Sequence, residues 1–259
     1  MNNMIQNENG QNRFRDLLIP VWSHQHGAYI TLITGWLVGT LLSETVSRIH
    51  GAVFIFLMAG LNFGELVQEY LKKKLSVSLR KQAWIILYGF LTMASCFYLL
   101  QNSISFNFIF PVLVALGVVY IYLSLKREHK HIFSELLAFA AIALGGLMAF
   151  EPQYMPGIEF LELWVLLTCY FGTSVFLVKA RFDKVTWKEI FLYFIVCAIL
   201  TAAIMKISVI FFSILFLIAF KLLTVLLAES WYKNLRITTI GFMECGYCLI
   251  LVTVLVTAH

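Results

Sequence analysis

The sequence predicts an all-α fold, a polytopic transmembrane bundle of about nine helices. Of its 259 residues, 61% are hydrophobic and 13% are charged, and the mean hydropathy is +0.85. The apolar residues form long blocks, each about as long as a helix needs to cross a bilayer, and the charged residues gather between them. This composition excludes a soluble globular domain. The expected organisation is a short polar cytoplasmic tail over residues 1–22 and a single transmembrane helical domain over residues 23–259.

Each expected span is an apolar run that ends where polar or charged residues interrupt it. Polar residues at 43–48 end the first run, and the lysine-rich segment 72–81 follows the second. Only Lys206 and its neighbours separate the seventh run from the eighth, so a very tight turn is expected there. In chain order, the expected spans are Gly27–Ser43, Ile49–Glu69, Trp84–Leu100, Phe106–Leu125, His131–Phe150, Phe160–Ala180, Trp187–Met205, Ile207–Ala228 and Ile237–Ala258.

The connecting segments alternate in charge, and this alternation predicts the orientation in the membrane. Lysine and arginine gather in the tail and in the segments 72–81, 126–130, 179–188 and 233–236. The segments 43–48, 101–105 and 151–159 nearly lack them. Because cation-rich loops are retained in the cytoplasm, we expect a protein of the bacterial inner (cytoplasmic) membrane with its N-terminus inside and His259 outside. The net charge of +5 lies in these short loops, so it predicts contact with the lipid bilayer and no binding of nucleic acid.

Six ionisable residues within the expected spans lie toward the cytoplasmic end. Each costs roughly 2.5–3.5 kcal/mol at a helix centre in lipid, so each is expected to face the protein interior or a wet cavity. Together they predict a polar cavity that opens to the cytoplasm. They are Glu65, Glu69, Glu135, Lys179, Lys221 and Glu244.

Two histidines stand where the tail meets the first span. His24 and His26 precede Gly27, which permits close approach of another backbone. An interfacial cap, with Trp22 and Tyr29 as belt aromatics, is one interpretation. Acid–base or ligand chemistry by the two imidazoles is the other.

Two carboxylates lie on one face at the cytoplasmic end of the second span. Glu65 and Glu69 are four residues apart, with Asn62 one turn behind them. Such a pair can chelate a divalent ion or pair with cations. Pairing with the lysine run at 72–74 accounts for Glu69 better than for Glu65, which lies deeper in the span.

The start of the fifth span carries a third polar stripe. Glu128 and His131 are three residues apart, and His131 and Glu135 are four apart. An E-x-x-H stripe occurs in di-iron bundles, where paired copies supply the metal ligands, and no second copy is found here. We therefore expect Glu135 to be the buried partner of a cation.

Two further constellations lie in the second half of the chain. Lys179 and Arg181 end the sixth span, where they either snorkel to the interface or bind an anion such as a diphosphate. Lys221 and Glu244 lie about 12 Å of helix rise from the loop that joins the last two spans, so they are expected to meet at equal depth. A structural ion pair and a functional relay are both open for them.

These segments resemble the YwiC-like family of bacterial integral membrane proteins. The resemblance rests on His26-Gly27-Ala28-Tyr29, on Arg127-Glu128 with Ser134-Glu135-Leu136, on Lys179-Ala180-Arg181, and on Gly241-Phe-Met-Glu244. It covers most of the chain. It implies the architecture of a polytopic membrane protein more than a particular activity.

The chain is more distantly similar to the UbiA-type prenyltransferase superfamily, which implies a UbiA-like arrangement of nine helices around a cytosol-facing cavity. Acidic motifs of that superfamily, at the ends of helices two and six, bind an isoprenoid diphosphate through magnesium. Its pattern is N-x-x-x-D-x-x-x-D, whereas Asn62 is followed by Glu65 and Glu69, each one position early. Where a second acidic motif would stand, this sequence has Lys179, Arg181 and Asp183.

The leading functional hypothesis is therefore a UbiA-like transferase that binds an isoprenoid diphosphate or a similar anionic amphiphile. The expected acid–base residues are His26, Glu65, His131 and Glu135. The expected substrate ligands are Asn62, Arg80, Arg127, Lys179, Arg181, Lys221 and Glu244. The expected Mg²⁺ ligands are Glu65, Glu69 and Asp183. Two alternatives stay open: a transporter that uses Lys221, Glu244 and Glu135 as a relay, and a non-catalytic membrane subunit or assembly factor that binds metal or haem.

Overall fold

The computed structural model describes residues 19–22, 26–72, 78–126, 132–150, 152–181, 185–204, 209–227 and 229–258. These residues contain no β-strand and form nine α-helices of 15 residues or more, so the predicted all-α bundle is confirmed. The long helices are α2 (His26–Leu41), α3 (Arg48–Lys72), α4 (Leu79–Asn102), α5 (Ile104–Leu125), α6 (Ile132–Gly146), α7 (Ile158–Arg181), α8 (Trp187–Ile204), α9 (Val209–Leu227) and α11 (Ile237–Ala258). Two short elements complete the set, the 3₁₀ turn η1 (Leu147–Ala149) and α10 (Glu229–Asn234).

Six of these helices are long and apolar enough to cross a membrane, namely α3, α4, α5, α6 with η1, α7 and α11. The apolar parts of α2 and α9 are shorter, at Gly27–Leu41 and Phe212–Thr224. The outward-facing side chains agree with a lipid environment: Phe90, Met93 and Phe97 on α4 are 68%, 71% and 65% exposed. Such a run of exposed apolar side chains suits lipid and not water. The chain is a multi-pass integral membrane protein.

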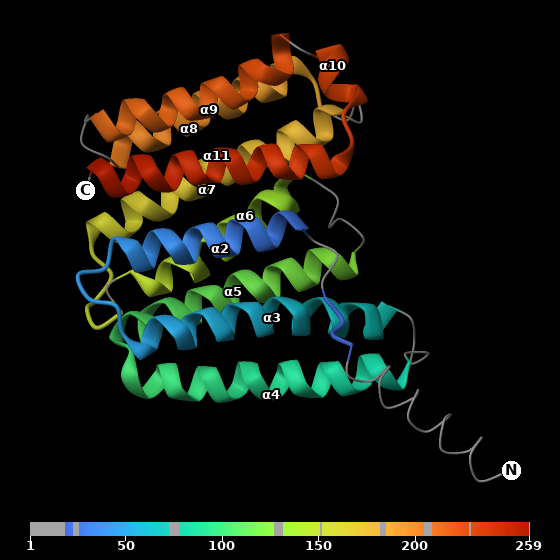
Figure 1. The fold of residues 1–259 in the computed structure, drawn as a ribbon, viewed down its shortest axis with the longest axis vertical. Helices are drawn as coiled ribbons and strands as arrows, with labels where there is room; N and C mark the ends of the chain where they lie inside the picture. The colour runs from blue at the N-terminus through green and yellow to red at the C-terminus, as the bar shows by residue number, and fades with distance from the viewer. Residues whose placement is uncertain are drawn as a thin grey trace, which may run out of the picture.

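The helices lie side by side in a stack (Figure 1). Helix α4 forms one end of the stack and packs on α3, while α8 and α9 lie at the other end and pack on α7. Helices α2 and α6 occupy the middle, where α2 packs on α6 and α11, and α6 packs on α5 and α7. The order of the helices in the stack therefore differs from their order in the chain.

Glycines bring the two central helices into backbone contact. A Cβ atom built on Gly146 would lie 2.7 Å from the carbonyl carbon of Gly35, and one built on Gly39 would lie 2.9 Å from the amide nitrogen of Phe150. Small residues are how membrane helices approach this closely. The α2–α6 crossing thus depends on the absence of side chains at these positions.

A reciprocal capping interaction begins α8. The backbone N–H of Thr186 donates to Glu189 Oε2 at 2.7 Å, and the N–H of Glu189 donates to Thr186 Oγ1 at 3.4 Å. This is a capping box, in which a threonine and a glutamate three residues later satisfy each other's free amides. It fixes where α8 starts after the cation-rich segment that follows α7.

Candidate functional site

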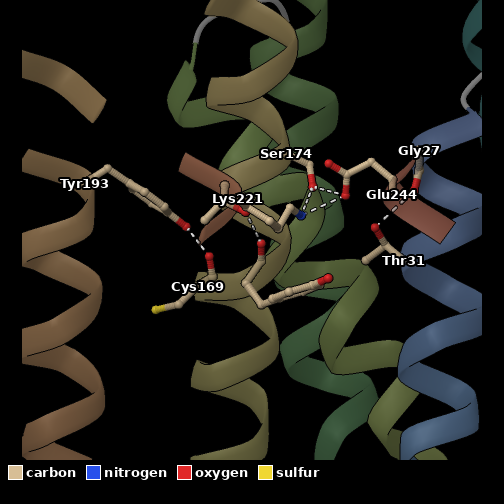
Figure 2. Close-up of polar contacts among 9 residues, drawn as sticks. Gly27, Thr31, Cys169, Ser174, Tyr193, Lys221 and Glu244 are labelled. Carbon is tan, nitrogen blue, oxygen red and sulfur yellow. Dashed lines mark hydrogen bonds and ion pairs between the residues drawn. The ribbon is translucent and has the colours of Figure 1, made fainter. Parts of the chain in front are cut away.

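Three helices of the second half bring a lysine, a glutamate and a serine together inside the bundle (Figure 2). The ammonium Nζ of Lys221 on α9 lies 2.7 Å from Oε2 of Glu244 on α11. It also donates to Oγ of Ser174 on α7 at 3.1 Å, and the Ser174 hydroxyl donates to the same Glu244 oxygen at 3.0 Å. We call these three residues the α7–α9–α11 cluster. The predicted meeting of Lys221 and Glu244 is confirmed.

Burial makes this cluster unusual. The Lys221 side chain is 0% exposed and the Glu244 side chain is 13% exposed. A charge taken out of water costs several kcal/mol in a protein interior, about as much as a well-placed partner returns. The positive and negative charge here compensate each other, so the cluster is neutral as a whole.

Two aromatic rings complete the surroundings of the ammonium. Nζ of Lys221 lies 4.3 Å from the ring centroid of Tyr170 and 5.6 Å from that of Tyr247. Tyr170 is four residues before Ser174, so both lie on one face of α7, and Tyr247 is three residues after Glu244 on one face of α11. Aromatic faces attract cations within about 6 Å. The cluster is therefore shaped around a primary ammonium group.

A second lysine–glutamate pair joins α6 and α7. Nζ of Lys179 lies 3.1 Å from Oε1 of Glu135, with side chains 11% and 34% exposed. The expected ion pair of Glu135 with a cation is confirmed, although the Glu135 side chain is only partly buried. Lys179 follows Ser174 by five residues, so α7 contributes a residue both to this pair and to the α7–α9–α11 cluster. As an expected ligand of a phosphate, Lys179 already has an anionic partner within the chain.

The predicted group on α3 is held by contacts of its own. Nδ2 of the buried Asn62 donates to the carbonyl of Met58 at 2.7 Å, and its Oδ1 accepts from the Tyr29 hydroxyl at 2.5 Å. Lys81 on α4 lies 2.6 Å from Glu69. Glu65 lies half-buried between Asn62 and Glu69. These contacts tie α3 to α2 and α4.

Arg80 also has a different contact from the expected one. Its Nε and Nη2 donate to the backbone carbonyls of Ile19 and Pro20 at 2.9 and 3.1 Å. The Tyr88 hydroxyl donates to the next carbonyl, that of Val21, at 3.2 Å. Arg80 therefore holds residues 19–22 against α4, and a phosphate would compete with these carbonyls for its donors.

Several predicted site residues are not placed. Arg127, His131 and Asp183 lie outside the described residues, and so do the side chains of His26 and Arg181. Among the residues that the structure does describe, no group of three or more His, Cys, Asp or Glu could hold a metal ion. A Mg²⁺ site that includes Asp183 stays a prediction.

The two groups of predicted residues lie in different parts of the stack. Helix α3 carries Asn62, Glu65 and Glu69 and packs on α4, α2 and α6, whereas α7 packs on α6, α9 and α8. Helices α2 and α6 lie between α3 and α7 (Figure 1). A ligand that touches both groups would have to reach past these two helices.

The N-terminal half of the bundle carries a family signature. Residues 22–150, about half of the chain, match the family described as YwiC-like protein. The chain belongs to the YwiC-like family. No curated protein and no solved structure matches it. The YwiC-like region covers α2 to η1, so it contains Glu135 but not Lys179 or the α7–α9–α11 cluster.

Sequence reasoning missed part of the cluster in this YwiC-like chain. Tyr170 and Tyr247 were not among the expected site residues, and Ser174 had no assigned role. The sequence feature that could have indicated the tyrosines is their spacing, because each lies one helical turn from a polar residue of the cluster. That signal is weak in a sequence with 11 tyrosines, most of which belong to other surroundings.

Proposed function

We propose that this YwiC-like protein is a membrane transporter and that its solute binds at the α7–α9–α11 cluster. The observation that carries the proposal is a fully buried Lys221 paired with Glu244 inside a multi-pass bundle. Ionisable residues within membrane segments are costly and mark the paths of ions, protons and substrates. We place the protein in the bacterial cytoplasmic membrane, with the N-terminus in the cytoplasm, because of the charge of its loops.

A purely structural role explains the cluster less well. Replacing a buried ion pair by apolar residues of similar volume is often neutral or stabilising, so stability alone does not call for Lys221 and Glu244. A transporter does need groups that can exchange partners while the total charge stays compensated. The second pair joins Lys179, near the C-terminal end of α7, to Glu135 on α6, and it supplies a further partner for such an exchange.

The test is transport by the full-length protein in proteoliposomes. We would apply concentration jumps of a cation (ethylammonium or sodium chloride), an anion (sodium acetate) and a neutral solute (glycerol). Transport is measured as current and, with a pH dye inside the vesicles, as a change of internal pH, relative to protein-free vesicles. We expect a protein-dependent signal with one or more of these solutes. The neutral double variant Lys221→Met/Glu244→Gln should fold and lose that signal.

Two outcomes would overturn the transport proposal. One is the absence of any protein-dependent signal with all three solute classes. The other is an equal signal in the wild type and in the folded double variant, because the cluster would then play no part in transport. Lys126→Met is the matched control, since it removes an exposed lysine at the end of α5. It should transport as the wild type does.

A transferase that binds an isoprenoid diphosphate, with Mg²⁺ as cofactor, is the second function that we carry forward. Its support is the cationic end of α7, with Lys179 and Arg181, in a chain that resembles the UbiA-type superfamily. The pairing of Lys179 with Glu135 and the contacts of Arg80 count against it, because both side chains have intramolecular partners. The position of α2 and α6 between α3 and α7 counts against it as well.

The transferase proposal has a direct binding test. If it holds, farnesyl diphosphate should raise the unfolding temperature of the purified protein more than a simple lipid does, and Mg²⁺ should increase the effect. Arg181→Ala should weaken binding about tenfold or more, since a charge-assisted hydrogen bond contributes about 1.5–3 kcal/mol. Lys126→Ala serves as the control. A shift no larger than that of simple lipids, or a wild-type response of Arg181→Ala, would remove this candidate.

A further inference from the structure

We propose that the α7–α9–α11 cluster binds a primary ammonium cation, which takes the place of the Lys221 ammonium on Glu244 and thereby releases a proton. This inference rests on the proposed transport function and names the chemical class of its solute. It also names the ion that would be exchanged. A cation that enters while a proton leaves is an antiport step.

The partners of Lys221 define what the cluster recognises. They are one carboxylate oxygen at 2.7 Å, one hydroxyl oxygen at 3.1 Å and two tyrosine rings. Carboxylates and hydroxyls accept N–H donors, and aromatic faces attract the positive charge. The lysine side chain ends in –CH₂–NH₃⁺, so the cluster already accommodates an alkylammonium. A free primary ammonium with a short alkyl chain presents the same donors and the same charge.

Charge balance decides what happens to Lys221. Two ammonium groups beside one carboxylate would leave an uncompensated positive charge in apolar surroundings, which is costly. A second cation can therefore pair with Glu244 without adding net charge only if Lys221 transfers a proton to water. The balanced step is therefore that R–NH₃⁺ enters and pairs with Glu244, Lys221–NH₃⁺ becomes Lys221–NH₂, and H⁺ leaves to water. The net charge of the cluster is the same before and after.

The other groups around Lys221 do not disturb this balance. Tyr170 and Ser174 face it from α7, and Tyr247 and Cys248 face it from α11 beside Glu244. None of these four groups is normally charged at neutral pH. Of the described side chains on α8 and α10, which also pack on α9, none forms an ion pair with Lys221. Among the described side chains, Glu244 is thus the anion with which a new cation would pair.

The experiment measures proton release from the purified full-length protein in detergent. Ethylammonium chloride is added to a weakly buffered solution that contains a pH indicator. We expect a saturable release that approaches about one proton per protein, because binding and deprotonation are linked. Tetramethylammonium chloride has no N–H donor and should release none. Sodium chloride at the same concentration controls for ionic strength.

Variants identify the site. Ethylammonium should also raise the unfolding temperature of the wild type. Glu244→Gln should abolish both this stabilisation and the proton release. Lys221→Met/Glu244→Gln should behave in the same way and keeps the cluster neutral, which protects the test if the single variant does not fold. Ser174→Ala should weaken ethylammonium binding about tenfold, which corresponds to about 1.4 kcal/mol. Lys126→Met should match the wild type.

Three results would overturn the inference: no release with ethylammonium, an equal release with tetramethylammonium, or an undiminished release in the double variant. Stabilisation by ethylammonium without proton release would overturn the exchange step. The transport assay separates this inference from the proposed function. Anion- or glycerol-driven signals without ethylammonium binding would leave transport standing and remove the ammonium site. Ethylammonium binding without any transport signal would leave the ammonium site standing and remove the proposed transport function.

Discussion

Lys221 is the residue on which the charged interior of this protein depends. Its ammonium contacts Glu244, Ser174 and two tyrosine rings, and its side chain is fully buried. The loss of one charge of such a pair leaves the other buried without compensation, which costs more than the pair itself contributes. The two charges should therefore be coupled strongly in stability as well as in function.

We predict this coupling in a double-mutant cycle. Lys221→Met should lower the free energy of unfolding by about 3–5 kcal/mol, because the Glu244 carboxylate is left unpaired. Adding Glu244→Gln should restore most of that loss. The measurement is the unfolding temperature of the purified variants in detergent, with the exposed Lys126→Met as control. Additive losses in the double variant would show that the two side chains do not act as a pair.

The depth of charged residues could be predicted from the sequence, but their surroundings could not. Lys221 and Glu244 lie at similar distances from the turn between two antiparallel helices, so their meeting follows from helix geometry. Which face of α7 turns toward them depends on how the helices pack. The sequence therefore did not assign Tyr170 and Ser174 to this cluster.

At the scale of the elements, the crossing of α2 and α6 fixes the middle of the stack. A Cβ atom on Gly146 would meet backbone atoms of Gly35 and Trp36 at 2.7–2.8 Å, and backbone cannot move aside as a flexible side chain can. We predict that Gly146→Ala lowers the free energy of unfolding by about 1–3 kcal/mol through overpacking. The readout is the unfolding temperature in detergent.

Gly117→Ala is the matched control for this crossing. Gly117 lies within α5, and a Cβ atom there meets no atom within 4 Å. Since alanine favours a helix over glycine by up to about 1 kcal/mol, Gly117→Ala should be neutral or stabilising. Equal effects of the two substitutions would mean that helix propensity, and not the α2–α6 contact, sets the result.

The helices themselves were largely predictable, because long apolar runs and charged interruptions mark where a chain can cross a bilayer. The expected break near Lys206 agrees with α8 ending at Ile204 and α9 beginning at Val209. The helix α4 begins at Leu79, five residues before the apolar run at Trp84, because Arg80 and Lys81 extend it beyond the apolar part. The short α10 was not expected, since six residues carry too little periodicity to predict a helix.

At the scale of the whole molecule, the order of the helices in the stack could not be predicted. Apolar runs specify that helices cross the membrane, but most of their surface is apolar on every side, so the pattern does not specify neighbours. The placement of α2 and α6 between α3 and α7 follows from small residues and side-chain packing. The expected cytoplasmic cavity and the UbiA-like arrangement stay predictions.

The whole bundle has one orientation to test. The C-terminal ends of α3, α5 and α7 lie at the same end of the stack as α10 (Figure 1). In the chain, the cation-rich segments 72–81, 126–130 and 179–188 follow α3, α5 and α7, so the positive-inside rule predicts that this end faces the cytoplasm. The turn that contains Gln153, between η1 and α7, belongs to the opposite end. We therefore expect a solute to reach the α7–α9–α11 cluster from the cytoplasmic side, near the C-terminal end of α7.

We predict that a membrane-impermeant maleimide labels Gln153→Cys in intact cells and does not label Ser76→Cys. After the cells are broken open, Ser76→Cys should react as well, which shows that its thiol is accessible but on the inner side. The unmodified protein, with its five native cysteines, gives the background. The opposite pattern, with Ser76→Cys labelled in intact cells, would invert the bundle. It would then place the Lys179–Glu135 pair toward the outside and remove the expected cytoplasmic access to Lys221.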